Sequence, residues 1–433
     1  MTTTIFWFRN DLRLHDQVAL QAAMGARRLL PVVCTPGMDT PTAWGFARMG
    51  RHRRAWWASA VRHLARALQT AGSQLLVLDE PPATALPALA HAVGADGVVC
   101  EDIAAPDEQA EVAAVRAAGL PVLTIWHSSL FDPAQLPWPL QQLPDSFTHF
   151  RQAVEQTGLT PAAPLPPVGR LAPWPRGVPD SVLEAQRRTW ARLSAIAPAA
   201  DARSAFPYLQ SGLHAGESAA RAHLARYLAS DLPARHKRAR NGLAGQGYSS
   251  KWSPWLATGA LSPRKALEQL RRYEAVHGAS EGTRCLWLEL LWRDHLRFLH
   301  LRHGPALYRA RGLAHAPTPT HQPERFAAWC AGRTGQPLAD AGMRELAATG
   351  YLGNRLRQIV ASFLVHDLAC EWRAGAAWFE HQLLDYDVYS NQGNWIFLAS
   401  RRTHPRARRR FDPARQAGRY DPDGHYRQLW GTA

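Results

Sequence analysis

The spacing of apolar residues changes partway along the chain, and this change limits the folds that the chain can form. Up to about residue 130, short apolar runs alternate with longer amphipathic stretches, of which residues 53–70 are an example. This alternation is typical of parallel strands that are joined by helices. The sequence therefore predicts a Rossmann-like parallel α/β domain, with strands at residues 4–9, 28–34, 74–78, 97–101 and 120–126.

Glycine-rich nucleotide loops are absent from this first part of the sequence. It contains neither GxGxxG nor GxxxxGK[ST], the patterns of ordinary dinucleotide and triphosphate sites. A ligand could still bind at the carboxyl ends of the strands, where parallel sheets usually hold one.

The pattern changes again after the first domain. Prolines are dense over residues 158–180 and cannot continue a helix or a central strand. From about 200 to 400 the apolar period is helical and tryptophans recur. A chain of 433 residues also exceeds the usual size of one hydrophobic core. We therefore expect an α/β domain over 1–130, a connector over 131–199, an all-α domain over 200–400 and a basic tail over 401–433.

The chain is basic, with a formal net charge of +15, and nearly all of its basic residues are arginines. Arginine pairs with phosphate through a planar fork, so one interpretation is a polyanionic partner. The other is a solvated basic surface from an arginine-rich proteome, and composition does not decide between them.

Cysteine usage and hydropathy exclude other classes. The five cysteines are scattered without a CxxC pair, so we expect neither a disulfide framework nor a zinc site. No apolar run approaches about eighteen residues, and charges interrupt the N-terminal stretch where a signal peptide would be apolar. We therefore expect a globular, cytoplasmic protein.

A serine cluster precedes a proline in the helical part. Ser249, Ser250 and Ser253 lead into Pro254, which suits the first turn of a helix. Backbone amides and hydroxyls at such a helix start could face an anion. Plain N-capping by serine is the alternative, and by itself it is the commoner explanation.

A second segment, residues 286–299, carries polar side chains within a helical pattern. Helical spacing puts Glu289, Trp292 and Arg293 on one face, which could hold a planar, polar ligand. The alternative is an exposed ion pair between Glu289 and Arg293 beside a core tryptophan, which the spacing alone favours.

The third segment runs from residue 349 to 395. We expect one helix from residue 354 that ends at Gly375, with Asn354 and Arg357 on one face. The later stretch LLDYDVYSNQGNW offers Asp385, Asp387 and Asn391 as donors and acceptors close to that face, if the chain folds back. A flavin ring needs such mixed hydrogen bonding along its polar edge. Turn-forming Asp and Asn are the alternative.

Motifs over nearly the whole chain resemble those of the photolyase and cryptochrome flavoproteins, and most closely those of the DASH cryptochromes. The motifs are long and ordered: FWFRNDLRLHD at 6–16, LPDSFTHFRQAVE at 143–155, RNGLAGQGYSSKWSPWLATGALSPR at 240–264, ELLWRDHLRF at 289–298, a run from TGQPLAD to NQGNW at 334–395, and FDPARQAGRYDPDGHY at 411–426. The resemblance implies an α/β antenna domain followed by an all-α domain that binds FAD.

The resemblance also implies a set of FAD-binding residues. The positions that hold the phosphates are matched by Arg240, Ser249, Ser250 and Ser253. Asn391 matches the residue that faces flavin N5, and Asp385 matches the partner of Arg357. The implied cofactor-binding residues are Arg240, Ser249, Ser250, Lys251, Trp252, Ser253, Glu289, Arg293, Asn354, Arg357, Asp385, Asp387 and Asn391.

Electron transfer and substrate binding are implied in the same way. Trp395 and Trp372 resemble the first two members of a tryptophan chain that passes electrons to flavin, and a third is missing between Arg311 and Phe326. Tyr308, Trp329 and Trp378 are the candidates to replace it. The residues that match a pocket for a flipped pyrimidine dimer are Glu289, Trp292, Arg355, Gln358 and Phe397, with Glu289 placed to hydrogen-bond a thymine.

Some positions depart from the family pattern. His236 replaces a tyrosine at the phosphate site, Phe397 replaces a tryptophan of double-strand photolyases, and Gly353 replaces a polar residue. In the first domain, Glu108 matches a residue that contacts a folate antenna, which implies methenyltetrahydrofolate.

Two functions are compatible with this sequence. The first is repair of cyclobutane pyrimidine dimers under blue light by electron donation from reduced FAD, acting best on single-stranded DNA, which the changes at residues 397 and 353 favour. The alternative is a signalling photoreceptor, perhaps a DNA-binding regulator, that uses the same flavin without repair. Asn391 and the face of Glu289 and Trp292 favour a working dimer pocket.

Overall fold

A computed structural model describes residues 2–196, 201–210, 212–314, 317, 319–401 and 410–431. Most of the arginine-rich stretch that opens the predicted basic tail, residues 402–409, therefore lies outside the described residues. No helix among the described residues is long and apolar enough to cross a membrane.

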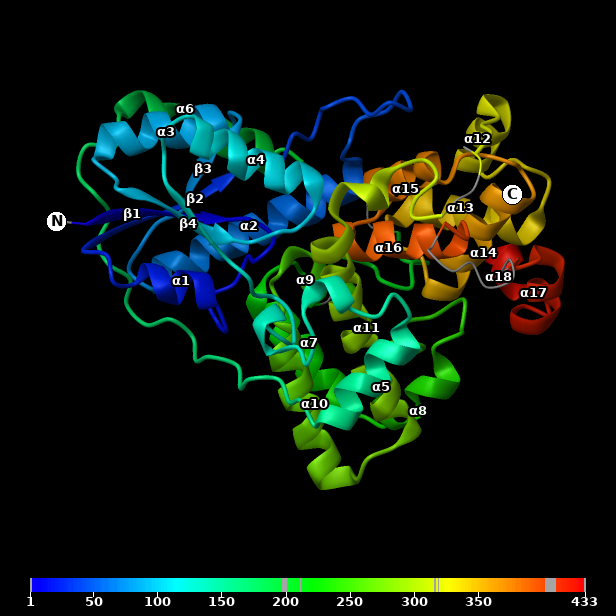
Figure 1. The fold of residues 1–433 in the computed structure, drawn as a ribbon. Coiled ribbons are helices and arrows are strands. Elements are labelled where there is room, and N and C mark those ends of the chain that lie inside the picture. The colour runs from blue at the N-terminus through cyan, green and yellow to red at the C-terminus, as the bar shows by residue number, and fades with distance from the viewer. Residues whose placement is uncertain are drawn as a thin grey trace.

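The first part of the chain forms a five-stranded parallel sheet, which confirms the predicted α/β fold (Figure 1). Its order is β3-β2-β1-β4-β5, with bounds Thr3–Phe8 for β1, Arg28–Cys34 for β2, Leu76–Leu78 for β3, Gly97–Glu101 for β4 and Val122–Ile125 for β5. The register pairs Ile5 with Leu30 on one side and with Val98 on the other. These apolar runs are buried on both faces of the sheet, as parallel strands usually are.

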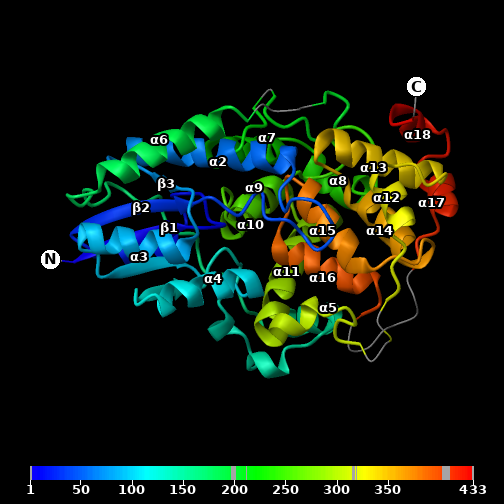
Figure 2. The same cartoon turned by 90° about the horizontal axis from the view of Figure 1, so that it is seen from above.

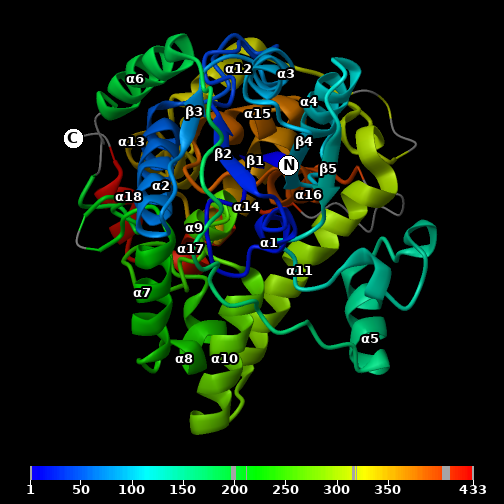
Figure 3. The same ribbon diagram turned by 90° about the vertical axis from the view of Figure 1, so that its left-hand side faces the viewer.

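Alternate strand residues face two helical layers. Ile5 and Trp7 of β1 pack with α3 (Pro82–Val93) and α4 (Pro106–Ala117), whereas Phe6 and Phe8 pack with α1 (Val18–Ala23) and α2 (Arg51–Thr70). The end-on view shows α3 and α4 on one side of the sheet and α1 and α2 on the other (Figure 3). The expected helix at 53–70 is therefore present as α2.

The stretch predicted as a connector contains helices on both sides of its proline-rich part. Residues 158–179 have no helix or strand, as their prolines predict. Before them, α5 (Phe147–Thr157) packs against α11 (Glu281–His303), and after them α6 (Asp180–Ser194) packs against β3. This part of the chain thus adds a helix to each half of the molecule.

The second half is helical, as predicted, and it surrounds the long helix α11. Its other helices are α7 (Glu217–Leu228), α8 (Leu232–Ala239), α9 (Ser253–Thr258), α10 (Pro263–His277), α12 (Pro323–Cys330), α13 (Pro337–Thr349), α14 (Asn354–His366), α15 (Trp372–Gln382) and α16 (Val388–Leu398). Two more, α17 (Pro413–Tyr420) and α18 (His425–Leu429), lie far from the start of β1 (Figure 2) and pack on α13 and α14.

The predicted helix from residue 354 ends earlier than the sequence suggested. Helix α14 stops at His366, and Gly375 lies inside the next helix, α15, rather than at a helix end. A Cβ atom at Gly375 would lie 2.3 Å from Cη2 of Trp395. The glycine is therefore needed for close packing of α15 on α16, a contact that the local pattern cannot reveal.

Charged residues of α11 join the helical half to the sheet. Asp294 is fully buried, and its Oδ2 accepts hydrogen bonds from the amides of Leu130 at 2.8 Å and Phe131 at 3.0 Å, just after β5. Nearby, Arg297 donates to the carbonyl of His127 at 2.8 Å. Buried backbone amides need such partners, so this helix determines where the chain leaves the sheet.

We predict that Asp294→Ala lowers the free energy of unfolding by about 1–3 kcal/mol, because two buried amides lose their acceptor. Burial raises the pKa of Asp294 to about 6. The folded protein therefore holds this proton more tightly than the unfolded chain, and the stabilising contribution of the carboxyl falls as the pH rises through about 6.

Urea unfolding of the wild type and the variant at several pH values would test this. The difference between them should be larger at low pH than at neutral pH. Glu281→Ala, at an exposed carboxylate on the same helix, is the control and should change stability by less than about 0.5 kcal/mol. A difference that grows with pH would contradict the assignment.

Candidate functional site

Three distant segments meet at a buried carboxylate. Asp385, between α15 and α16, accepts two hydrogen bonds from Nη2 of Arg357, at 2.9 Å and 2.8 Å. Its Oδ2 also accepts from Oγ of Ser253 at 2.7 Å. Burial alone would lower the pKa of Arg357, but the charge of Asp385 raises it. The structure thus brings together the serine cluster, the start of α14 and the stretch before α16.

The serines do not cap a helix in the ordinary way. Helix α9 begins at Ser253 with Trp252 at the N-cap position, and no side chain caps it. The carbonyl of Ser250 accepts from Nε2 of His223 at 2.8 Å. Plain N-capping, the commoner explanation from sequence, is therefore not what these residues form.

Unsatisfied polar atoms gather in the segment before α9. Nζ of Lys251, the hydroxyl of Tyr248 and Nε1 of Trp252 are buried and have no hydrogen-bond partner among the described residues. The Lys251 ammonium lies 3.4 Å from the centroid of the Tyr248 ring, and burial lowers the pKa of this lysine to about 7. Buried donors without acceptors are costly. They fit an anionic ligand such as the diphosphate of FAD.

Packing explains why a glycine stands at position 353, just before α14. A Cβ atom at this position would lie 2.6 Å from the hydroxyl of Tyr248. The tyrosine thus fills the space in which a polar side chain would stand. The glycine that replaces the family's polar residue at position 353 is therefore required by the position of Tyr248.

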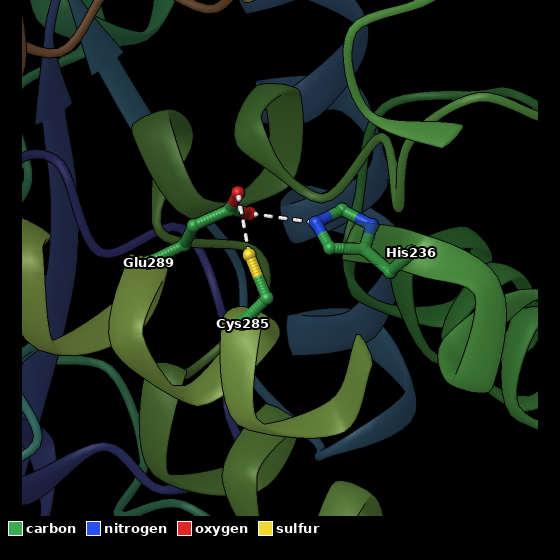
Figure 4. Close-up of side chains that lie close together, drawn as sticks. All are labelled: His236, Cys285 and Glu289. Atoms are coloured by element: carbon green, nitrogen blue, oxygen red, sulfur yellow. Dashed lines mark hydrogen bonds and ion pairs between the residues drawn. The ribbon is translucent and has the colours of Figure 1, made fainter. Parts of the chain in front are cut away.

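Glu289 does not pair with Arg293, so the ion pair that the spacing favoured is not formed. Its Oε2 instead contacts Nε2 of His236 at 3.1 Å (Figure 4). Its Oε1 accepts from Nη1 of Arg240 at 3.1 Å. Burial would raise the pKa of Glu289, but the hydrogen bond and charge of His236 lower it. The carboxylate side chain is 44% exposed, so it remains open to solvent.

Arg293 turns inward instead. Its Nη1 donates to the carbonyl of Ser128 at 2.5 Å, and its Nη2 lies 3.6 Å from Oδ2 of Asp387. Oδ1 of Asp387 accepts from the amide of Ser390 and so caps α16. Burial would raise the pKa of Asp387, but the charge of Arg293 lowers it. Asp387 therefore has a local role as a helix cap, whereas Asp385 pairs with Arg357.

Two aromatic side chains of the predicted substrate pocket come together. Trp292 and Phe397 meet edge to face with 6.2 Å between ring centroids, and both are partly exposed. The ring centroid of Phe147 in α5 lies 4.8 Å from that of Trp292. The local sequence around Trp292 did not point to Phe147, although it lies within the motif at 143–155 that carries part of the resemblance.

Two polar members of that predicted pocket, Arg355 and Gln358, lie at the start of α14. Arg355 donates to Oδ1 of Asn241 at 2.7 Å and to Oε1 of Gln358 at 3.1 Å. Its guanidinium also lies 4.9 Å from the ring centroid of Tyr420 in α17. Asn354 is exposed. Sequence reasoning missed Asn241 and Tyr420, because their contact with Arg355 depends on the tertiary fold.

Asn391 lines a cavity of about 170 Å³ between the two halves. Its Nδ2 donates to the carbonyl of Ala376 at 3.0 Å, and among the described residues it has no hydrogen bond to Arg357 or Asp385. Glu108 lines the same cavity, and its buried Oε2 has no hydrogen-bond partner among the described residues. Burial raises the pKa of Glu108.

Trp395 belongs to a connected row of aromatic rings. It contacts Phe379 with 5.1 Å between centroids and Trp329 with 6.5 Å. Trp329 stacks on Phe326 at 6.0 Å, and Phe326 lies 6.4 Å from Trp44, a partly exposed residue after β2. The row therefore leads from a buried tryptophan toward the surface.

Among the described residues, the other electron-chain candidates have no ring contact with Trp395, although Trp378 is connected to Phe326 of the row by way of Phe46. Trp372 is buried and donates from Nε1 to the carbonyl of Ala310 at 2.8 Å, without a ring partner among the described residues. Trp378 contacts Phe46 at 5.1 Å. Tyr308 lines the cavity that contains Glu108.

Comparison with known proteins agrees with these observations. Residues 4–168 match the family described as DNA photolyase, and residues 286–431 match the FAD binding domain of DNA photolyase. The cryptochrome DASH of Xenopus laevis is 39% identical, covering 98% of this chain and 81% of its own length. The cryptochrome DASH of Gloeobacter violaceus is 38% identical, and the match covers 99% of this chain and 85% of that protein.

Solved structures show the same fold. A cryptochrome of Synechocystis sp. matches with a TM-score of 0.90 and 35% identity, covering 99% of this chain and 88% of its own. A class III photolyase of Agrobacterium tumefaciens matches with a TM-score of 0.76 and 29% identity, and the match covers 99% of this chain and 86% of the photolyase chain. The chain therefore belongs to the photolyase and cryptochrome family and, within it, to the DASH cryptochromes, with an FAD-binding helical domain.

Proposed function

We propose that this protein binds DNA and repairs cyclobutane pyrimidine dimers under blue light, preferentially in single strands, with reduced FAD as the electron donor. The observation that carries the proposal is the set of contacts around α11 and α14. Asp385 binds Arg357 and Ser253 through its buried carboxylate. In the same helical half, the side chain of Glu289 stays open to solvent. Bound FAD supplies light absorption and a transferable electron.

The chain's own residues would hold the cofactor at two ends. Lys251 and the serines before α9 would face its phosphates, because the buried ammonium needs an anion. Asp385 holds Arg357 rigidly in place, so the guanidinium can hydrogen-bond a ring without changing rotamer. Asn354, Asp387 and Asn391 complete the set that the family resemblance implies.

The dimer pocket would use Glu289 together with the aromatic pair. Glu289 would accept a hydrogen bond from the N–H of a thymine ring, and Trp292 and Phe397 would stack on the flipped bases. Arg355 and Gln358 would contact the adjacent backbone. The basic surface adds attraction for phosphates that does not depend on base sequence.

The preference for single strands follows from the cost of flipping. Taking a dimer out of a duplex costs a few kcal/mol of unpairing and unstacking, which the pocket must offset. Phe397 can stack but carries no N–H donor. The space beside Gly353 is filled by the side chain of Tyr248, so residue 353 itself supplies no polar side chain. A lesion that is already unpaired therefore suits this pocket better.

The cavity between the two halves is a candidate antenna site. In the part of the chain that the structure describes, a buried carboxyl oxygen of Glu108 has no hydrogen-bond partner. This oxygen suits a heterocycle that offers N–H donors, as a pterin does. Arg48 of the first half binds Glu380 of α15 at 2.7 Å on the cavity wall. Methenyltetrahydrofolate is the ligand that we propose.

Electron supply would begin at Trp395, as the resemblance implies, with Trp372 as the second member. The ring row adds a candidate for the missing third tryptophan. Trp329 contacts Trp395 directly and is fully buried, and the row continues by way of Phe326 to Trp44. We therefore favour Trp329 over Trp378 and Tyr308 as the replacement.

We predict faster repair of dimers in single strands than in matched duplexes. A flipping cost of a few kcal/mol corresponds to a preference of roughly 10- to 100-fold. The measurement is dimer loss under blue light in matched oligonucleotides incubated with reduced protein. Equal repair of both would contradict the argument from Phe397 and Gly353. Repair of neither would favour the photoreceptor function.

Variants at two tryptophans of α11 test whether repair depends on the proposed dimer pocket. Trp292→Ala should abolish or strongly weaken repair while FAD stays bound, because base stacking on an aromatic side chain contributes about 1–3 kcal/mol. Trp287→Ala, on the same helix but packed against Arg271, is the control and should keep repair. Equal loss in both variants would point to damage of the helix.

We predict that Asp385→Ala loses FAD and is destabilised by about 3–5 kcal/mol, because the partly buried Arg357 is left without its charge partner. Flavin content after gel filtration and urea unfolding measure the two effects. Asp201→Ala removes the partner of a more exposed Arg203 and should cost less than about 1 kcal/mol. Full flavin content with unchanged stability in Asp385→Ala would refute the cofactor assignment.

Photoreduction tests the aromatic row. We predict that Trp395→Phe slows flavin photoreduction sharply while FAD stays bound, since a phenyl ring keeps much of the indole volume. Trp329→Phe should slow it further in a Trp372→Phe background, and Trp190→Phe in α6 should have no effect. Flash spectroscopy in the presence of an external reductant measures these rates. An unchanged rate in the Trp329 variants would exclude Trp329 from the route.

A further inference from the structure

Three metal-binding side chains converge where α8 meets α11. They are His236, Cys285 and Glu289, whose ligand atoms all lie within 4.8 Å of one another (Figure 4). Oε2 of Glu289 lies 3.1 Å from Nε2 of His236, and Sγ of Cys285 lies 3.8 Å from Oε1 of Glu289. The sequence did not suggest a zinc site, because His236 is about fifty residues away from the other two and no CxxC pair is present.

The fold holds these three side chains in place. Cys285 and Glu289 are four residues apart on α11, so they lie on the same helix face. Helix α8 approaches that face very closely at Gly282, where a Cβ atom would lie 2.2 Å from the carbonyl oxygen of Pro233. A larger residue at position 282 would push α8, and His236 with it, away from Cys285.

A second contact orients the imidazole. Nδ1 of His236 lies 3.3 Å from the hydroxyl of Tyr227, which leaves Nε2 directed at Glu289. Histidines that bind metals commonly have such a partner on the other ring nitrogen, because it sets the tautomer and the ring orientation. His236 is itself buried, so its position is restricted by packing.

We propose that His236, Cys285 and Glu289 form a binding site for Zn²⁺. One nitrogen, one sulfur and one carboxylate oxygen are the ligand types that zinc accepts, whereas Mg²⁺ and Ca²⁺ prefer oxygen alone. In a tetrahedral zinc site neighbouring ligand atoms lie about 3.3–3.7 Å apart. The distance from Nε2 of His236 to Oε2 of Glu289, 3.1 Å, is close to that range. Sγ of Cys285 lies 3.8 Å from the other carboxylate oxygen, Oε1, and the three ligand atoms lie within 4.8 Å of one another.

Charge and access are compatible with the ion. When the bond from sulfur to zinc forms, the thiol proton of Cys285 passes to solvent, and the thiolate and the Glu289 carboxylate neutralise the two positive charges. Arg240 can keep its contact with Oε1 of Glu289 while Oε2 binds the metal. The partly exposed side chain of Glu289 leaves the fourth position to water.

The consequence for DNA rests on the proposed function, because it takes Glu289 as a contact of the dimer. A carboxylate that is bound to zinc cannot also accept a hydrogen bond from a thymine in the same geometry. Zinc bound here would therefore weaken binding of the lesion.

The first test is a calorimetric titration of metal-free, FAD-loaded protein with ZnCl₂, with MgCl₂ as a parallel control. We expect one equivalent of Zn²⁺ to bind and Mg²⁺ not to compete. Cys285→Ser and His236→Gln should each weaken zinc binding at least about tenfold, and Tyr227→Phe should weaken it about tenfold through the orientation of His236. Cys330→Ser, at a partly exposed cysteine in α12, is the matched control and should bind as the wild type does.

A second measurement needs no variant. Co²⁺ in a tetrahedral site absorbs in the red, where oxidised flavin does not. One equivalent of CoCl₂ should therefore produce these bands in the wild type, and ZnCl₂ should remove them. Absence of the bands together with absence of zinc binding would overturn the proposal, as would zinc binding that is equally strong in Cys285→Ser.

The third measurement concerns the lesion. Zn²⁺ should weaken binding of a single-stranded oligonucleotide with a pyrimidine dimer in the wild type, and this effect should disappear in Cys285→Ser. A loss of affinity that is equal in both proteins would overturn the link between the metal and Glu289. Failure to bind the oligonucleotide even without zinc would contradict the proposed function, whereas the metal site would still stand on its titration.

Discussion

The buried charges of α11 are the constraint on which the rest of the structure depends. Asp294 accepts from two amides just after β5, and Arg293 and Arg297 donate to carbonyls of the same segment. Buried charges and buried amides are costly without partners, so the sheet and the helical half can meet in few other ways. The open side of the same helix presents Glu289 and Trp292. The attachment of the two halves therefore also positions the candidate dimer pocket.

Small residues set the distances between the elements of the site. Gly375 lets α15 pack against the ring of Trp395, and Gly353 leaves room for the hydroxyl of Tyr248. Gly282 lets α8 approach α11, which brings His236 to Glu289. Each of these glycines stands where a Cβ atom would overlap a neighbour that comes from a distant part of the sequence. Their role is close approach between elements rather than turn formation.

Much of the fold could be predicted from the sequence, because strand and helix periods are local properties. Alternation of short apolar runs with amphipathic stretches predicted all of the strands of the sheet and the helix α2. Local reasoning was wrong where a tertiary contact decides the outcome. Gly375 resembles a helix end but lies inside α15, and Glu289 lacks the partner that helical spacing favours because Arg293 is drawn inward by Ser128 and Asp387.

The sequence by itself determined the class of each half and, through long motifs, the family to which the chain belongs. It also indicated that Arg357 and Asp385 would meet if the chain folded back, as they do. Only the tertiary structure decided the other partners: Ser253 for Asp385, His236 and Arg240 for Glu289, and Phe147 for Trp292. The physical reason is that hydrogen bonds and ring contacts act over a few ångströms, and only folding brings distant segments within that range.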